Sequence, residues 1–267
     1  MTNNSRTIGV FDSGVGGLSV LRHIRALLPH ENLIYIADSA HVPYGDKPAA
    51  YIEQRALSLT KFLVERGAAA IVIACNTATA AAVATLRSHY ALPIVGMEPA
   101  VKPAIAATHS GVVGVLATTG TLESARFAAL LERYAGTVNI ITQGCPGLVE
   151  QVERGELASA ATRTLLERYI APLLSQGADT LILGCTHYPF LTALIQEVAG
   201  PDVRLIDTGA AVARQLQQRL PERAAITQQE AGLIHFFSSG NAAHAAQIIS
   251  ALWQQLVTVQ CLPSAYA

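Results

Sequence analysis

Charged residues are scarce in this chain of 267 residues: they make up 14% of it, and the formal net charge is −1. Without a basic excess, the composition indicates no surface for the phosphates of a nucleic acid. No apolar stretch approaches the roughly 18 residues that a membrane-spanning helix requires. The sequence therefore argues against nucleic-acid-binding and membrane-embedded proteins. Its apolar residues, 51% of the total, favour a buried core instead.

Lysine and cysteine are also few. A pyridoxal phosphate enzyme needs a lysine for its Schiff base, and only Lys47, Lys61 and Lys102 are present, none in a recognisable cofactor motif. The N-terminal segment lacks the basic start and apolar stretch of a secretory signal, so we expect a cytoplasmic protein. In that compartment a disulfide framework is not expected. We therefore expect free thiols at Cys75, Cys145, Cys185 and Cys261.

Two of the cysteines stand in matching contexts. Cys75 ends the apolar run IVIAC and is followed by Asn76 and Thr77, whereas Cys185 ends LILGC and is followed by Thr186 and His187. A single thiol after a strand is usually a small buried hydrophobic group. Two thiols in the same context, 110 residues apart, instead suggest two equivalent reactive groups that face one site. Such symmetry is suited to chemistry on both faces of one atom.

The similarity extends to the strands around the cysteines. The run at 8–11 reappears at 113–116, at an offset of 105, and the strand-then-carboxylate pattern at 94–98 reappears at 204–207, at an offset of about 109. Together with the two cysteine runs, these are three pairs of matching segments in the same order, and they predict two similar halves. A chain of this length is also at the size where one core begins to divide into two.

Short apolar strands alternate with helical segments along the chain. The clearest helices, 49–67 and 158–177, each end in a glycine suited to a left-handed cap. We predict an α/β fold of two similar, doubly wound parallel-sheet domains that face each other across a cleft. The predicted strands are 8–11, 33–37, 70–74, 93–96, 112–116, 138–142, 180–183, 203–206 and 234–238.

Both cysteines, together with the Asp12-Ser13-Gly14 turn, follow predicted strands, and ligands of such sheets bind at the carboxyl ends of strands. If helices begin directly after both cysteines, their N–H groups favour the thiolate and can hold a substrate carboxylate. One thiol with a lowered pKa would act as a base while the other acts as an acid. Asp12 is placed to assist the first thiol and His187 the second.

Four strings in order, IGVFDSGVGGLSV, DSAHVPYG, IVIACNTATA and LILGCTHYP, resemble the glutamate racemase family of the aspartate/glutamate racemase superfamily. The resemblance runs from about Ile8 to the segment ending at Gly240. It implies cofactor-independent interconversion of L- and D-glutamate, with no metal. It also implies two domains, one of residues 1–97 and 208–267 and one of residues 98–207, with the stretch from Val212 packing back on the first.

The resemblance implies a role for each residue that coincides with a family motif. Cys75 and Cys185 would be the acid–base thiols, one on each face of the α-carbon. The auxiliary catalytic groups would be Asp12, His187 and Glu153. The residues that would bind the amino acid are Asp12, Ser13, Tyr44, Gly45, Asn76, Thr77, Thr118, Thr121, Thr186 and His187.

Several alternatives remain at this point. Glu150 stands where many relatives have proline, so either Glu150 or Glu153 is the acidic residue that faces the site. Aspartate is an alternative substrate, because no motif lysine or arginine indicates the side-chain carboxylate. A binding protein that closes on an amino acid without reacting is the alternative from another functional class.

Two further readings are disfavoured. The run Gly14-x-Gly16-x-x-Ser19, with Asp38 at the end of the next strand, nearly matches the dinucleotide fingerprint, but its third glycine is missing and Asp12 would repel a pyrophosphate. A zinc site built from Asp12, Cys75, Cys185 and His187 lacks the usual ligand spacings.

For the biological role, the resemblance implies supply of D-glutamate for peptidoglycan, and hence a function in cell wall synthesis and cell shape. It implies a homodimer with a small-molecule substrate, and we expect neither a nucleic-acid nor a membrane partner. Some family members carry a longer N-terminal extension linked to activation by a peptidoglycan precursor, and only seven residues precede the first predicted strand here. We therefore expect activity without an activator.

Overall fold

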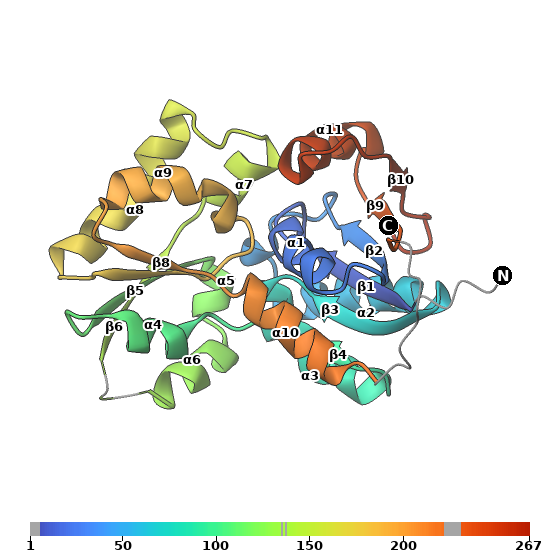
Figure 1. Cartoon of the computed structure of the whole chain (residues 1–267), viewed down its shortest axis with the longest axis horizontal. Coiled ribbons are helices and arrows are strands. Elements are labelled where there is room, and N and C mark those ends of the chain that lie inside the picture. Colours follow the sequence, from blue (N-terminus) through green and yellow to red (C-terminus); the bar gives the residue numbers. More distant parts are fainter. Residues whose placement is uncertain (1–5, 135, 137, 222–230) are drawn as a thin grey trace.

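The fold consists of two fully parallel sheets in a computed structural model that describes residues 6–134, 136, 138–221 and 231–267. The six-stranded sheet has the order β10-β9-β2-β1-β3-β4 and the four-stranded sheet the order β6-β5-β7-β8. In Figure 1 the first sheet lies on the right and the second on the left. The predicted α/β fold with two parallel sheets is confirmed. The strands are β1 (Thr7–Asp12), β2 (Asn32–Ala37), β3 (Ala68–Ile73), β4 (Ile94–Val95), β5 (Val112–Ala117), β6 (Asn139–Gly144), β7 (Thr180–Leu183), β8 (Arg204–Ile206), β9 (Ile234–Ser238) and β10 (Val259–Cys261).

The two sheets repeat the same strand order. The run β2-β1-β3-β4 of the first sheet corresponds to β6-β5-β7-β8 of the second, and the predicted offsets relate β1 to β5, β3 to β7 and β4 to β8. Cys75 follows the end of β3 by two residues, and Cys185 follows the end of β7 by two residues. The two thiols therefore occupy equivalent positions in the two halves.

Helices cover both sheets because their apolar faces must be buried against the strands. The two predicted helices are found as α2 and α8, and the glycines that follow them, Gly67 and Gly177, have φ of 79° and 89°. None of the described helices is long and apolar enough to cross a membrane. The helical segments are α1 (Leu18–Leu27), η1 (Tyr44–Asp46), α2 (Ala49–Glu65), α3 (Asn76–His89), α4 (Val101–Ala107), α5 (Thr119–Leu122), α6 (Ala125–Glu132), α7 (Leu148–Glu153), α8 (Ala160–Ser175), η2 (Tyr188–Leu191), α9 (Thr192–Ala199), α10 (Gly209–Arg219) and α11 (Ala242–Trp253).

The chain after β8 returns to the first sheet. Helix α10 packs on α1, and β9 and β10 extend the first sheet beyond β2. Strand β10 was not predicted from the sequence; it is a three-residue edge strand in which Gln260 and Cys261 are exposed. The division into domains 1–97 with 208–267 and 98–207 stays a prediction. Residues 1–5, 135, 137 and 222–230 of those ranges lie outside the described residues.

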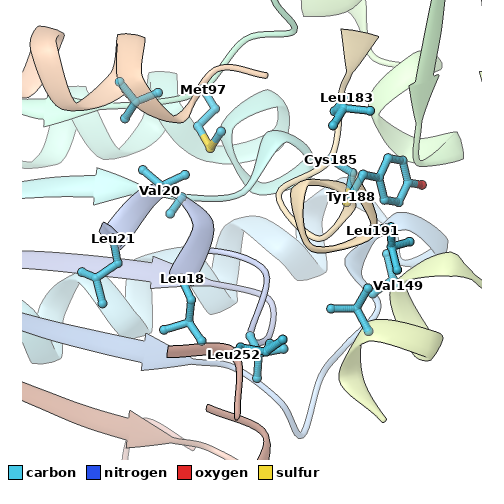
Figure 2. Packing of buried hydrophobic residues seen from close by; sticks show 14 of the residues in the cluster. Leu18, Val20, Leu21, Met97, Val149, Leu183, Cys185, Tyr188, Leu191 and Leu252 are labelled. Atoms are coloured by element: carbon cyan, nitrogen blue, oxygen red, sulfur yellow. The ribbon is translucent and has the colours of Figure 1, made fainter. Parts of the chain in front are cut away.

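Buried side chains from both halves share one hydrophobic cluster. Leu18 of α1 and Leu252 of α11 belong to the same cluster as Val149 of α7 and Leu191 of η2. Figure 2 shows these residues between the ribbons of the two halves. The two halves are thus joined by packed apolar side chains as well as by the connecting chain.

Candidate active site

Cys75 and Cys185 line one cavity, as their equivalent positions at strand ends predict. The volume within the cavity that the centre of a water molecule can occupy is about 10 Å³. This is room for about one water. A pocket that encloses an amino acid must be far larger. The cavity as described is therefore too small to hold a molecule much larger than water. The cavity is lined by Ser13, Pro43, Tyr44, Gly45, Cys75, Asn76, Thr77, Thr118, Val149, Gly184, Cys185, Thr186 and His187.

The first thiol stands at the N-terminus of α3. The Ala78 N–H donates to Cys75 Sγ at 3.4 Å, and the thiol lies 3.9 Å from Ser13 Oγ. The Ser13 hydroxyl in turn donates to Asp12 Oδ1 at 3.4 Å, while Asp12 Oδ2 accepts a shorter bond of 2.7 Å from the Gly17 N–H. A hydroxyl therefore connects Cys75 to a carboxylate that is fully buried.

The N-terminus of α3 favours the thiolate of Cys75, as expected, but it does not decide the pKa of this thiol. Burial raises the pKa of Cys75 well above its usual value, and the negative charge of Asp12 raises it further. The Ala78 N–H opposes these effects but does not outweigh them. Burial likewise raises the pKa of Asp12, against the opposing charge of His187 and the Gly17 N–H. Cys75 is therefore a protonated thiol in this state.

No α-helix begins directly after Cys185, so the condition of a helix start after both cysteines is met only at Cys75. The Tyr188 N–H donates to the Cys185 carbonyl at 3.1 Å, and this spacing of three residues is typical of turns and 3₁₀ segments. The chain continues as η2, and α9 begins only at Thr192. Cys185 consequently receives its polar contact from a side chain and not from a helix.

That side chain is His187, which joins the second thiol to Glu153. Its Nδ1 lies 3.7 Å from Cys185 Sγ, and its Nε2 lies 2.7 Å from Glu153 Oε1. Glu153 Oε1 also accepts a bond of 2.7 Å from the Val15 N–H. Glu150 lines a neighbouring cavity with Glu153 but has no contact with His187 among the described bonds. Of the two acidic residues left open by the sequence, Glu153 is the one joined to the site.

The pKa of His187 is raised well above its usual value. Burial alone would lower it, but the hydrogen bonds with Cys185 and Glu153, together with the negative charges of Cys185 and Asp12, outweigh burial. An imidazolium ion therefore lies between the sulfur and the carboxylate at neutral pH. It places a positive charge beside the second thiol, whereas the first thiol has the negative charge of Asp12 nearby.

The glycines after β1 are explained by this His187–Glu153 pair. A Cβ at Gly14 would lie 1.9 Å from Glu153 Oε1, and a Cβ at Gly16 would lie 2.3 Å from His187 Nδ1. Only glycine leaves room for these side chains. The turn that resembles a dinucleotide fingerprint is thus filled by a carboxylate and an imidazole, which leaves no space for a pyrophosphate.

Three threonines connect the two halves beside the cavity. Thr77 Oγ1 of α3 lies 2.9 Å from Thr118 Oγ1 and 3.2 Å from Thr121 Oγ1, at the start of α5. The Thr118 hydroxyl donates to Thr121 Oγ1 at 3.0 Å. Next to them, a Cβ at Gly120 would lie 2.9 Å from the Gly45 carbonyl. The predicted substrate contacts Gly45, Thr77, Thr118 and Thr121 are therefore brought together.

Two residues near the site were not identified from the sequence as functional. The Tyr44 hydroxyl donates to Asp38 Oδ2 at 2.5 Å, and Arg55 binds both oxygens of Asp38 at 3.0 and 2.8 Å. From the sequence, Asp38 was expected only as a possible ribose ligand, and no pattern pointed to Arg55. A buried acidic residue at the end of β2 is the signal that indicates such a role. The Asp38–Arg55 ion pair holds Tyr44 against the cavity.

The remaining predicted contacts also lie at the cavity. Asn76 begins α3, and its Oδ1 is buried without a hydrogen-bond partner among the described residues. Thr186 is buried, and its carbonyl accepts from Ser19 Oγ at 2.9 Å. Within the described part of the chain, no group of three or more His, Cys, Asp or Glu side chains is arranged to hold a metal ion.

The chain is similar to known racemases over its whole length. Residues 8–216 match the model of the Asp/Glu/Hydantoin racemase family. A glutamate racemase of Methylococcus capsulatus is 59% identical, over 100% of this chain and 99% of the relative. A crystal structure of a glutamate racemase of Bacillus anthracis has a TM-score of 0.88 at 31% identity, covering 98% of this chain and 99% of that one. The glutamate racemase of Escherichia coli, solved with L-glutamate and the activator UDP-MurNAc-ala, has a TM-score of 0.85 at 36% identity, covering 97% and 98%. On the sequence and on the fold alike, this chain belongs to the glutamate racemases of the Asp/Glu/Hydantoin racemase family.

Proposed function

We propose that this protein interconverts L- and D-glutamate, without a cofactor, by proton transfer between the α-carbon and two thiols. The observation that supports the proposal most directly is that Cys75 and Cys185 line one cavity from equivalent strand ends. The relatives named above are glutamate racemases, and one of them was solved with L-glutamate. A protein that only binds an amino acid would have no need for a thiol on each side.

Inversion requires one thiolate and one thiol at the same moment. One sulfur removes the α-proton from one face of the carbon, and the other delivers its proton to the opposite face. In the described state Cys75 is the proton donor, because burial and Asp12 raise its pKa. When Cys185 acts as the base, the imidazolium of His187 at 3.7 Å stabilises negative charge on its sulfur. The reverse reaction uses the same groups in the opposite roles.

The polar groups around the cavity fit the two ends of an amino acid. The N-terminus of α3 offers unpaired N–H groups and a positive dipole end to a carboxylate, next to the hydroxyl of Thr77. The unpaired Oδ1 of Asn76 is an acceptor for the substrate ammonium group. Further hydroxyl and backbone groups for glutamate come from Ser13, Tyr44, Gly45, Thr118, Thr121 and Thr186, with Asp12 and His187 at the thiols.

We further infer that the D-glutamate formed serves peptidoglycan synthesis in the cytoplasm, and hence cell wall biogenesis and cell shape. This role rests on the family to which the chain belongs. A homodimer is the proposed assembly. Its test is the molar mass in solution by light scattering, where the mass of a single chain, 28.1 kDa, would contradict it.

The deciding experiment is isotope exchange in deuterated water. The purified protein is incubated with L-glutamate, and separately with L-aspartate, without any cofactor. We expect loss of optical rotation together with deuterium at the α-carbon for glutamate, and neither change for aspartate. Deuterium without inversion would contradict the two-thiol mechanism. If neither substrate reacts, the assay is repeated with UDP-MurNAc-ala, and failure there too would favour a binding protein.

A further inference from the structure

A second cavity adjoins Cys185, besides the one that it shares with Cys75. Cys185 and Thr186 lie at its inner end, and its walls include Val20, Met97 and Leu183. Figure 2 shows Val20 and Met97 on one side of this region and Leu183 and Cys185 on the other. The cavity offers about 30 Å³ to the centres of water molecules. Since one water needs roughly 10–15 Å³ on this measure, it has room for about two.

The outer end of this cavity reaches the protein surface between α1 and the start of α10. Its lining there includes His23 and Asp207, both of which are exposed. A Cβ at Gly209 would lie 2.6 Å from His23 Cδ2, so the absence of a side chain at this position allows the imidazole to approach. The Gly209 N–H donates to Asp207 Oδ1 at 3.0 Å. An imidazole and a carboxylate therefore stand together at the mouth.

Polar groups continue from the mouth toward the thiol. Ser19 is one helical turn before His23 on α1, and both line the cavity. The Ser19 hydroxyl lies 2.9 Å from the Thr186 carbonyl, directly after Cys185, and 2.9 Å from the Gly16 carbonyl. With Thr208 they provide the two to four polar partners that an enclosed water requires. The cavity therefore has polar groups from the solvent to the buried Cys185, beside its apolar walls.

Two-thiol inversion creates a need for a route between each thiol and the solvent. After one inversion, the sulfur that removed the α-proton is protonated and the other sulfur has lost its proton. Before the same enantiomer can react again, both thiols must exchange protons with solvent. Cys75 and Cys185 are only 5% and 7% exposed, so neither exchanges readily through the surface.

We propose that the cavity behind Cys185, with His23 at its mouth, is the route by which this thiol exchanges its proton with solvent between turnovers. The proposal rests on the proposed racemase function. In the outward step the S–H bond of Cys185 breaks, a water takes the proton, and a proton passes to a ring nitrogen of His23, which releases it to solvent. The inward step is the reverse. Imidazole suits this task because one ring nitrogen can accept a proton while the other donates one.

The test measures whether a proton removed from one substrate molecule reaches another before it is lost. L-glutamate with deuterium at the α-carbon is mixed with ¹³C-labelled D-glutamate in water, and L-glutamate that carries both labels is measured by mass spectrometry. Such molecules form only when a thiol keeps its deuteron until the next substrate arrives. The mirror mixture, deuterated D-glutamate with ¹³C-labelled L-glutamate, reports on the other thiol.

We expect His23→Gln to raise the doubly labelled product by about tenfold or more in one of the two mixtures only, the one that reports on Cys185. Adding imidazole to His23→Ala should reverse the rise, which a purely structural defect would not allow. Gly209→Ala, which displaces the ring of His23, should act in the same direction. His235→Gln, at an exposed histidine of β9, is the matched control and should match the wild type.

An unchanged pattern in His23→Gln would overturn the exchange route, as would an equal rise in both mixtures. These outcomes are distinct from failure of the proposed function. In that case the wild-type protein would invert neither enantiomer in either mixture.

Discussion

The two thiols occupy the same position in the two halves of the molecule but have different surroundings. Cys75 is the N-cap of α3 and is linked to buried Asp12 through the hydroxyl of Ser13. Cys185 lies before a turn and contacts the imidazole of His187, which is bound to Glu153. One thiol thus has a helix end and a neutral hydroxyl, and the other has a cation and its carboxylate partner.

This difference shows how a repeated fold can perform an asymmetric task. Inversion needs an acid and a base at once, and two identical environments would favour the same protonation state for both sulfurs. Here the negative charge of Asp12 favours the protonated form of Cys75, while the imidazolium of His187 places positive charge beside Cys185. The strand order supplies the symmetry of position, and the loops after the strands supply the difference in charge.

The largest expected effect comes from removing either thiol. Cys75→Ser and Cys185→Ser should each lower the rate of inversion by about 10³-fold or more, because a serine hydroxyl is a far weaker acid and its alkoxide is not available near neutral pH. If the thiols act on opposite faces, each variant retains α-proton exchange for one enantiomer only. Proton NMR in deuterated water, starting from each enantiomer, measures this.

Cys261→Ser, which changes an exposed thiol at the sheet edge, is the matched control and should keep full activity. Loss of exchange for the same enantiomer in both active-site variants would contradict the assignment of one thiol to each face. Full turnover in either variant would show that its sulfur takes no part in the reaction.

The second effect tests the charged partner of Cys185. His187→Asn should lower inversion by about 100-fold, since it removes the positive charge beside the sulfur while keeping a polar side chain of similar size. Comparing exchange from L- and D-glutamate should show a larger loss for the enantiomer that Cys185 deprotonates. Equal losses for both enantiomers would mean that His187 supports the pocket as a whole and not one thiol.

The sequence predicted most of the architecture because buried parallel strands are short apolar runs that stand out in it. The equal spacing of Cys75 and Cys185 from their strands followed from the same pattern. Strand β10 was missed because a short edge strand with exposed Gln260 and Cys261 lacks that pattern. Strand positions thus depend on local composition and are readable from the sequence.

The electrostatics of the site were not readable in this way. The helix end lowers the pKa of Cys75 as expected, but burial and Asp12, 63 residues away, outweigh it. The pairing of Asp38 with Arg55 joins the end of β2 to α2, and the bond between Glu153 and Val15 joins the two halves. Such contacts depend on how separate elements pack within and between the two halves, and no local pattern encodes them.

The third effect concerns the carboxylate behind His187. Glu153→Gln removes a hydrogen-bond partner that raises the pKa of His187, so this pKa should fall. The imidazolium would then be lost at lower pH, and the alkaline limb of the rate profile should move to lower pH, with activity at neutral pH reduced about tenfold. Glu150→Gln, on the same helix but without contact to His187, should leave the profile unchanged and serves as the control.

Glu153→Gln should also change how the stability of the folded protein depends on pH. The pKa of His187 is raised above its ordinary value of 6.5 in the folded protein. Its contribution to stability is therefore fully present below pH 6.5 and is lost as the pH rises through the folded pKa. In thermal unfolding, Glu153→Gln should therefore make the difference in Tm between pH 6 and pH 9 smaller than in the wild type. An unchanged difference would mean that another group dominates this range.

The smallest expected effect comes from the hydroxyl between Asp12 and Cys75. Ser13→Ala removes contacts of 3.4 Å to Asp12 Oδ1 and 3.9 Å to Cys75 Sγ, both of which are long for hydrogen bonds. Long bonds contribute little, so we expect the rate to fall by only about two- to fivefold. Asp12 itself is held by the shorter bond from Gly17 and should keep its place. A loss as large as that of His187→Asn would mean that Ser13 relays the proton of Cys75 during the reaction, and the two thiols would then be supported in the same way after all.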